Sequence, residues 1–267
     1  MQTDGSEFVV VRGGKIEVRK AGRGQPLVFL HPGMGLFGAD SFLAALSNHF
    51  GVIAPSHPGF GLSELPDWMS TVDDLAYRYL DFLEKHDLRD VILVGSSFGG
   101  WIAAEIAVKS TDRIGCVVFV DTLGIKTGGR EDRDIADIYG LARKDLDGRY
   151  FSNPSAKPDI AKLPDEQLTI VARNRESEAL FGWAPYMHNP KLLGRLHRIS
   201  KPTLVMWGAG DGIVSQDYGR VFAAAIPDAT FAVVPEAAHY PYIEQPQECA
   251  HLIEQFAASK IRHRMFA

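Results

Sequence analysis

The sequence predicts an α/β protein with a doubly wound, mostly parallel sheet into which a helical segment is inserted. Short apolar runs alternate with amphipathic helical segments in both the first and the last part of the chain. These runs are continuously apolar, as is typical of strands buried on both faces of a sheet. From residue 122 to residue 198 no strand-like run occurs. We therefore expect a core of residues 1–121 and 199–267, with a helical cap formed by residues 122–198.

The first half of the chain begins with a predicted hairpin. Residues 8–11 and 16–18 flank Arg12-Gly13-Gly14-Lys15, a sequence typical of a tight turn. Further strands are expected at residues 27–30, 51–54, 91–94 and 116–120, and helices at residues 41–50, 72–83 and 99–109. Ser70 or Thr71 is the expected cap of the second helix, because acidic residues follow in its first turn.

The cap and the second half continue the pattern. One cap helix is expected to begin at Pro164-Asp165-Glu166, and another at Pro190, since proline suits the first helical position. After Lys201-Pro202 the alternation returns. Strands are expected at residues 203–207 and 230–234, and helices at residues 218–226 and 246–258.

The composition is that of a soluble globular protein. Of 267 residues, 46% are hydrophobic and 23% are charged, and the net charge of −5 favours neither nucleic acid nor an anionic membrane as partner. Residues 1–7 lack the features of a signal peptide, and no run is long enough to span a bilayer, so we expect a cytoplasmic protein. Cys116 and Cys249 are expected to be buried thiols, with a disulfide as the second interpretation. The oligomeric state is not readable from the sequence.

The strongest functional motif is Gly95-Ser96-Ser97-Phe98-Gly99, between a predicted strand and a predicted helix. A turn from strand to helix within so few residues forces the central serine into strained geometry, and the glycines remove side chains that would clash. Such a nucleophile elbow holds the Ser97 hydroxyl at the N-terminus of a helix. Ser97 is therefore the candidate nucleophile.

A serine nucleophile needs a base, and the base needs an orienting group. Asp211 follows the strand at 203–207 and His239 follows the strand at 230–234, so both belong to loops at the carboxyl edge of the sheet. The alternatives are that Asp211 only forms a turn between glycines and that His239 only packs beside Tyr240 and Tyr242. The chain order Ser, Asp, His favours catalysis.

Taken together, the motifs resemble those of the α/β-hydrolase family over essentially the whole chain except the cap. The matching pieces are His31-Pro32-Gly33-Met34-Gly35, His57-Pro58-Gly59-Phe60-Gly61-Leu62-Ser63, Gly95–Gly99, Trp207-Gly208-Ala209-Gly210-Asp211, and His239 followed by Pro241 and Glu244. The resemblance implies that Ser97 is the nucleophile, His239 the base and Asp211 the orienting acid. It also implies an oxyanion hole from the backbone N–H groups of Phe98 and Gly33, with Met34 as the neighbouring candidate.

The chain departs from the family pattern at three places. Pro32 follows His31 where a glycine is usual, Ser56 stands where an aspartate is frequent, and Glu236-Ala237-Ala238 replaces a turn that usually contains glycine. None of these changes removes a member of the predicted triad.

A second motif, Gly33-Met34-Gly35-Leu36-Phe37-Gly38, matches the dinucleotide-binding pattern. That pattern also requires an acidic residue about 20 positions further on, where Ser56 and His57 stand instead. No motif of a nucleotide hydrolase or a zinc hydrolase occurs. We expect neither an organic cofactor nor a metal.

The predicted function is hydrolysis of small, rather apolar carboxylic esters by a serine hydrolase. A carbon–carbon bond hydrolase of vinylogous diketones is the alternative, although relatives of that kind often carry a tryptophan where this chain has Tyr240. A catalytically silent ligand-binding protein is the third possibility, whereas Ser97 argues against chemistry with an aspartate nucleophile. The apolar residues expected to line the substrate pocket are Met34, Phe37, Phe98, Trp183, Tyr186, Met187 and Tyr240.

Overall fold

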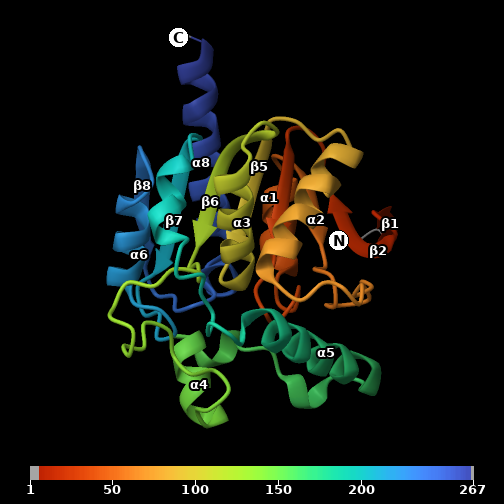
Figure 1. The fold of residues 1–267 in the computed structure, drawn as a ribbon, viewed down its shortest axis with the longest axis vertical. Coiled ribbons are helices and arrows are strands. Elements are labelled where there is room, and N and C mark those ends of the chain that lie inside the picture. The colour runs from red at the N-terminus through yellow and green to blue at the C-terminus, as the bar shows by residue number, and fades with distance from the viewer. Residues whose placement is uncertain (1–5, 266–267) are drawn as a thin grey trace.

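The computed structural model describes residues 6–265 and contains one eight-stranded sheet (Figure 1). The spatial order of the strands is β1-β2-β4-β3-β5-β6-β7-β8. The strands are β1 Glu7–Val11, β2 Gly14–Ala21, β3 Pro26–Leu30, β4 Gly51–Pro55, β5 Val91–Ser96, β6 Ile114–Val120, β7 Thr203–Gly208 and β8 Ala229–Val234. The pairs β1–β2 and β2–β4 are antiparallel, and every later pair is parallel. The predicted class, a mostly parallel sheet with an N-terminal hairpin, is confirmed.

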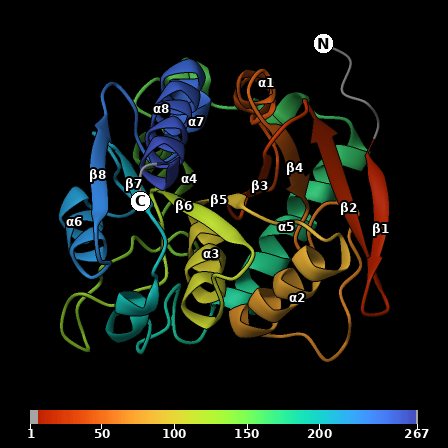
Figure 2. The same ribbon diagram turned by 90° about the horizontal axis from the view of Figure 1, so that it is seen from above.

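Helices cover both faces of the sheet. They are α1 Asp40–Ser47, α2 Val72–Lys85, α3 Phe98–Lys109, α6 Gln216–Ala224, α7 Pro241–Glu244 and α8 Pro246–Met265. Figure 2 shows α1, α7 and α8 on one face and α2, α3 and α6 on the other. Each face buries its own apolar cluster against the sheet, which is the doubly wound arrangement expected from the alternating pattern.

Local sequence explains two of these helices well. Thr71 caps α2: its hydroxyl accepts the N–H of Asp74 at 3.1 Å, and the Asp74 carboxylate accepts the N–H of Thr71 at 2.9 Å. Helix α3 has no polar face, and Phe98 to Val108 are all buried, so it packs at the centre of the molecule.

Residues 121–202, all of them described, add no strand to the sheet. They contain α4 Arg143–Tyr150, α5 Asp165–Gly182 and three 3₁₀ helices, η1 Pro154–Ala156, η2 Ile160–Lys162 and η3 Leu193–Arg198. Figure 1 shows α4 and α5 beyond one end of the sheet, opposite the C-terminal end of α8. Helix α5 begins where expected, but the α-helix expected from Pro190 is wrong. That stretch is a turn followed by the 3₁₀ helix η3, whose short, tight form buries Leu196 on one side.

Three smaller predictions concern the cysteines, the N-terminal residues and membrane-spanning helices. Cys116 and Cys249 are both buried, as the sequence predicts. Residues 1–5, part of the stretch in which no signal peptide is expected, lie outside the described residues. Within residues 6–265, no helix combines the length and the apolar character that crossing a membrane requires.

Candidate active site

Ser97 occupies a strained turn between β5 and α3. Its φ of 53° and ψ of −116° lie in a region that side-chain-bearing residues rarely adopt, at a cost of about 1–3 kcal/mol. The Ser97 N–H donates to the Val120 carbonyl at 2.9 Å, which ties the turn to β6. A Cβ on Gly99 would lie 2.1 Å from the Leu30 carbonyl oxygen, so only glycine lets α3 approach β3 this closely.

His239 and Asp211 complete a hydrogen-bonded chain with this serine. Nε2 of His239 lies 2.8 Å from Oγ of Ser97, and Nδ1 lies 2.8 Å from Oδ2 of Asp211. The imidazole side chain is 1% exposed and the carboxylate 0%. Because a carboxylate only accepts, the proton belongs on Nδ1, which leaves the Nε2 lone pair facing the serine hydroxyl.

Asp211 is itself held by backbone groups. Its second oxygen, Oδ1, accepts the N–H groups of Ile213 at 2.8 Å and Val214 at 3.1 Å. Two donors on one oxygen fix the orientation of the carboxylate. The structure therefore brings together the three residues that sequence motifs place on three separate loops.

A second carboxyl group, Asp121, lies beside Asp211 and was missed by the sequence analysis. Asp121 follows β6 and is fully buried, and its Oδ1 accepts the Gly208 N–H at 2.9 Å. Its Oδ2 accepts no hydrogen bond. Asp121 lies next to Asp211, and a protonated Asp121 donates a hydrogen bond to the Asp211 carboxyl group. Burial, followed by the charge of Asp211, raises the pKa of Asp121 well above its ordinary value. Its place directly after a strand that ends at the same sheet edge was the available signal.

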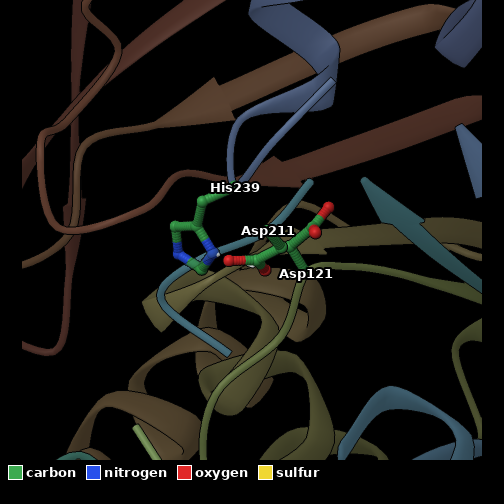
Figure 3. Close-up of side chains that lie close together, drawn as sticks. All are labelled: Asp121, Asp211 and His239. Atoms are coloured by element: carbon green, nitrogen blue, oxygen red, sulfur yellow. Dashed lines mark hydrogen bonds and ion pairs between the residues drawn. The ribbon is translucent and has the colours of Figure 1, made fainter. Parts of the chain in front are cut away.

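Figure 3 shows the side chains of Asp121, Asp211 and His239 gathered in one cluster. Their potential ligand atoms all lie within 4.8 Å of one another, so the group is also the one described cluster whose donors could surround a metal ion. Both nitrogens of His239 already face partners, however, and a metal would have to displace the Asp211 contact. The donor set fits proton transfer to and from Ser97 better than metal ligation.

Two backbone N–H groups of the predicted oxyanion hole have no protein acceptor. Among residues 6–265, neither the N–H of Gly33 nor that of Phe98 donates a hydrogen bond. Phe98 is the first residue of α3, so the positive end of the helix dipole adds to its N–H. Gly33 lies in the loop after β3 and is buried. Both N–H groups are therefore free to donate a hydrogen bond to a ligand.

Two buried histidine rings, those of His31 and His57, pack against each other where the loop after β3 begins. The His31 and His57 rings lie 3.7 Å apart, and Nε2 of His31 accepts the His57 N–H at 3.0 Å. The His57 ring reaches the Tyr79 hydroxyl and the His31 carbonyl. Burial lowers the pKa of His31 to about 4 and lowers that of His57 well below its ordinary value. Both rings are therefore uncharged near neutral pH.

A cavity of about 160 Å³ opens beside the site. Of the expected pocket residues, Met34, Phe37 and Tyr240 line it. Phe98 does not, because its ring is fully buried against Phe60, with ring centroids 5.9 Å apart. The cavity wall contributed by the segment between β6 and β7 consists of Arg143, Leu146, Asp147, Tyr150, Phe151, Lys157, Pro158, Ile160, Val171, Arg175 and Glu178.

The structure does not bring Trp183, Tyr186 and Met187 to this cavity. Trp183 is 62% exposed and packs edge-on against Tyr139 on the outside of the molecule. The Tyr186 hydroxyl donates to the Ala136 carbonyl and accepts the Ile138 N–H, and Met187 is fully buried. Helix α5, whose residues Val171, Arg175 and Glu178 line the cavity, ends at Gly182. Trp183, Tyr186 and Met187 follow that end and do not line the cavity.

One face of α5 holds the inserted segment against the sheet loops. Asn174 bridges two loops, since its Nδ2 donates to the Met34 carbonyl at 3.1 Å and its Oδ1 accepts the Gly61 N–H at 2.8 Å. One turn further on, the Ser177 hydroxyl donates to the Gly59 carbonyl at 2.7 Å. The polar spacing at 174, 177 and 178 was the available signal, because residues three and four apart share one helix face.

A serine on a strand-to-helix turn, with a carboxylate and an imidazole on later loops of a mostly parallel sheet, defines the class of α/β hydrolases. The chain belongs to the alpha/beta hydrolase family, whose model matches residues 27–252. This confirms the family resemblance seen in the sequence motifs.

Similar proteins include hydrolases that are named for different substrates. The 2-hydroxy-6-oxo-6-(2'-aminophenyl)hexa-2,4-dienoic acid hydrolase of Metapseudomonas resinovorans is 25% identical and covers 94% of this chain and 90% of its own. The pimeloyl-[acyl-carrier protein] methyl ester esterase of Vibrio cholerae is 27% identical and covers 88% and 95%. A solved meta-cleavage product hydrolase of Pseudomonas fluorescens has the same fold, with a TM-score of 0.76, 20% identity, and coverage of 95% of this chain and 97% of that chain.

Proposed function

We propose that this protein is a serine hydrolase that cleaves small, rather apolar carboxylic esters through an acyl-enzyme. The observation that carries the proposal is the chain from Ser97 through His239 to Asp211, with both contacts at 2.8 Å. A hydroxyl aligned with a buried, oriented imidazole becomes reactive at neutral pH.

Each step of the reaction has a residue in place. Oγ of Ser97 bonds to the ester carbonyl carbon while Nε2 of His239 takes the hydroxyl proton, and the N–H groups of Phe98 and Gly33 hold the oxyanion. The bond to the alcohol oxygen then breaks, and His239 returns the proton to the leaving alcohol. A water molecule then gives a proton to His239 and attacks the acyl-enzyme. As the bond between the acyl carbon and Oγ breaks, His239 returns this proton to Oγ, which releases the acid and free Ser97. Asp211 stabilises the charged imidazole without taking its proton.

We propose that residues 122–198 act as a cap that supplies part of the substrate pocket. Support comes from the contacts of Asn174 and Ser177 with the core loops and from the α4 and α5 residues that line the cavity. Met34, Phe37 and Tyr240 are the core side of the proposed pocket. Apolar walls around a few polar groups suit small organic substrates.

Carbon–carbon bond hydrolysis of vinylogous diketones is the second candidate. Relatives named as a dienoic acid hydrolase and a 2-hydroxymuconate semialdehyde hydrolase are each 25% identical over 94% of this chain, which favours it as much as the esterase relative favours ester cleavage. The deciding experiment is a panel of p-nitrophenyl esters of increasing acyl length beside a vinylogous diketone substrate. Ester turnover that exceeds diketone turnover supports the first function, and the reverse result promotes the second.

The third candidate, a ligand-binding protein without turnover, is separated by pre-steady-state kinetics. An enzyme that forms an acyl intermediate releases a rapid burst of p-nitrophenol, and a reactive phosphonate labels its Ser97 covalently. A protein that binds the ester but shows neither burst nor labelling is a binder.

A further inference from the structure

The cavity beside the site contains a carboxyl group that the proposed reaction does not use. Glu178 projects from α5 against the Gly33 loop, where a Cβ built on Gly33 would lie 1.8 Å from its Oε1. The absence of a side chain at position 33 is therefore what makes room for the carboxyl. The accessible part of Glu178 lines the cavity together with Met34 and Tyr240.

This carboxyl has no partner in the part of the chain that the structure describes: it makes no hydrogen bond and no ion pair there. The other charged groups of the cavity are engaged. Asp147 pairs with Arg143 at 3.4 Å and with Lys157. Arg175 donates to the Ile138 carbonyl at 3.2 Å and stacks over Tyr139. A carboxyl group that lines a cavity without a protein partner is available to accept a hydrogen bond from a ligand.

Two tyrosine hydroxyls share the cavity with Glu178. The rings of Tyr150 and Tyr240 are stacked, 5.1 Å apart and 3° from parallel, and both residues line the cavity. Among residues 6–265, neither hydroxyl forms a hydrogen bond. The Tyr150 ring also lies 5.7 Å from that of His239, so a residue of the cavity that Glu178 lines packs beside the proposed base.

The carboxyl is suited to accept a hydrogen bond near neutral pH. Burial raises the pKa of Glu178 to about 7, although the charge of Arg175 opposes the rise. Above that pH the carboxylate is a strong acceptor and repels other anions.

We propose that Glu178 is a specificity-determining residue, which accepts a hydrogen bond from a hydroxyl on the ester and rejects esters that carry a carboxylate at the same place. The substrate class is then a small ester with an apolar body and a hydroxylated end. This inference rests on the proposed ester hydrolysis and adds the polar feature that selects among esters.

The test compares matched esters at about pH 8, where the ionised form of Glu178 prevails. One series is methyl hydrocinnamate with its para-hydroxy and para-carboxy analogues, which presents the ring from the acyl side. The other is phenethyl acetate with the same two analogues, which presents it from the alcohol side. The measured quantity is kcat/KM for each ester, from chromatography of the products.

The wild-type protein is expected to favour the para-hydroxy ester over the parent by at least about tenfold in one of the two series, and to disfavour the para-carboxy ester by a similar factor. Glu178→Leu removes the acceptor, so the hydroxyl preference falls to near unity. Glu178→Gln removes the charge but keeps the size, so the penalty on the para-carboxy ester disappears. The matched control is Glu176→Gln, an exposed residue of the same helix, which keeps both ratios.

Three results overturn the proposal: a wild-type protein that treats all three esters alike in both series, a hydroxyl preference that persists in Glu178→Leu, or a para-carboxy penalty that persists in Glu178→Gln. If Glu178→Leu does not fold, Glu178→Gln decides alone through the para-carboxy penalty. Failure of the underlying function is distinct, because the wild type then hydrolyses none of the esters, or hydrolyses them equally well as Ser97→Ala.

Discussion

Asp121 and Asp211 place two buried carboxyl groups side by side at the carboxyl edge of the sheet, at the ends of adjacent strands. Only Asp211 contacts His239, at 2.8 Å. The described residues around Asp121 offer the backbone N–H of Gly208 and no cation. Two neighbouring carboxylates without a cation cannot both be ionised cheaply, and burial together with the charge of Asp211 raises the pKa of Asp121, so Asp121 keeps its proton.

Replacing Asp121 with asparagine is expected to change how stability depends on pH. The folded-state pKa of Asp121 is raised, so between its unfolded and folded pKa values only the folded protein binds this proton, and stability falls as pH rises. The introduced asparagine does not titrate, and its amide replaces the protonated carboxyl as donor to Asp211. Above about pH 4, the free energy of unfolding of the variant should rise relative to that of the wild type by up to about 1.4 kcal/mol per pH unit. Urea unfolding across this pH range measures the difference, and parallel curves for the two proteins contradict the assignment.

Ser97→Ala should abolish turnover while leaving the fold intact. Loss of a triad nucleophile costs on the order of 10⁶ in kcat in other serine hydrolases, and a Cβ alone keeps the backbone of the turn. Ser96→Ala is the matched control, since the Ser96 hydroxyl is buried without a hydrogen-bond partner and has no role in the proposed reaction. Steady-state hydrolysis of p-nitrophenyl esters tests both variants. Equal activity of Ser97→Ala and Ser96→Ala would refute the nucleophile.

The buried histidine pair should make the protein less stable in mild acid. The pKa of His31 falls from 6.5 to about 4 on folding, so below pH 6.5 the unfolded chain takes up a proton that the folded protein excludes. Stability is complete above this window and is lost as pH falls towards 4, by on the order of 3 kcal/mol for His31 alone. Unfolding in urea at several pH values measures the slope.

A variant pair isolates the contribution of the histidine. His31→Gln should be less stable at neutral pH, because the contact between the His31 and His57 rings is lost, but its stability should depend less steeply on pH. His197→Gln, at an exposed position of η3, should follow the wild type. An unchanged slope in His31→Gln would mean that other groups cause the loss.

The residues that local motifs define were accessible to sequence reasoning. Ser97, Asp211 and His239 each follow a strand of a parallel sheet, and parallel strands end at one edge, so chain position alone predicts their meeting. Thr71 was likewise identified as one of two possible caps from its neighbours. The positions of the core strands and helices were also predictable, because the pattern of apolar residues that defines them is local in the sequence.

The pocket could not be predicted in the same way. Its wall depends on how α4 and α5 pack over the sheet, and nothing local distinguishes Trp183, which lies outside, from Tyr150, which lines the cavity. Apolar character suggested Trp183 as a pocket residue, yet a large aromatic ring also packs on a surface tyrosine. Glu178 escaped notice because a glutamate on a helix is ordinarily a solvated residue.

The cavity wall predicts which substitution changes acyl selectivity. Phe37 lies in the loop after β3 and lines the cavity, so Phe37→Ala should enlarge it and raise kcat/KM for longer acyl chains relative to short ones. A methylene group accommodated in an apolar pocket is worth about 1–3 kcal/mol, so a shift of at least about tenfold across the p-nitrophenyl ester series is expected. Trp183→Ala should leave the acyl-length profile unchanged, because its ring is 62% exposed and faces away from the cavity. A profile that moves with Trp183 and not with Phe37 would place the acyl group on the other side of the inserted segment.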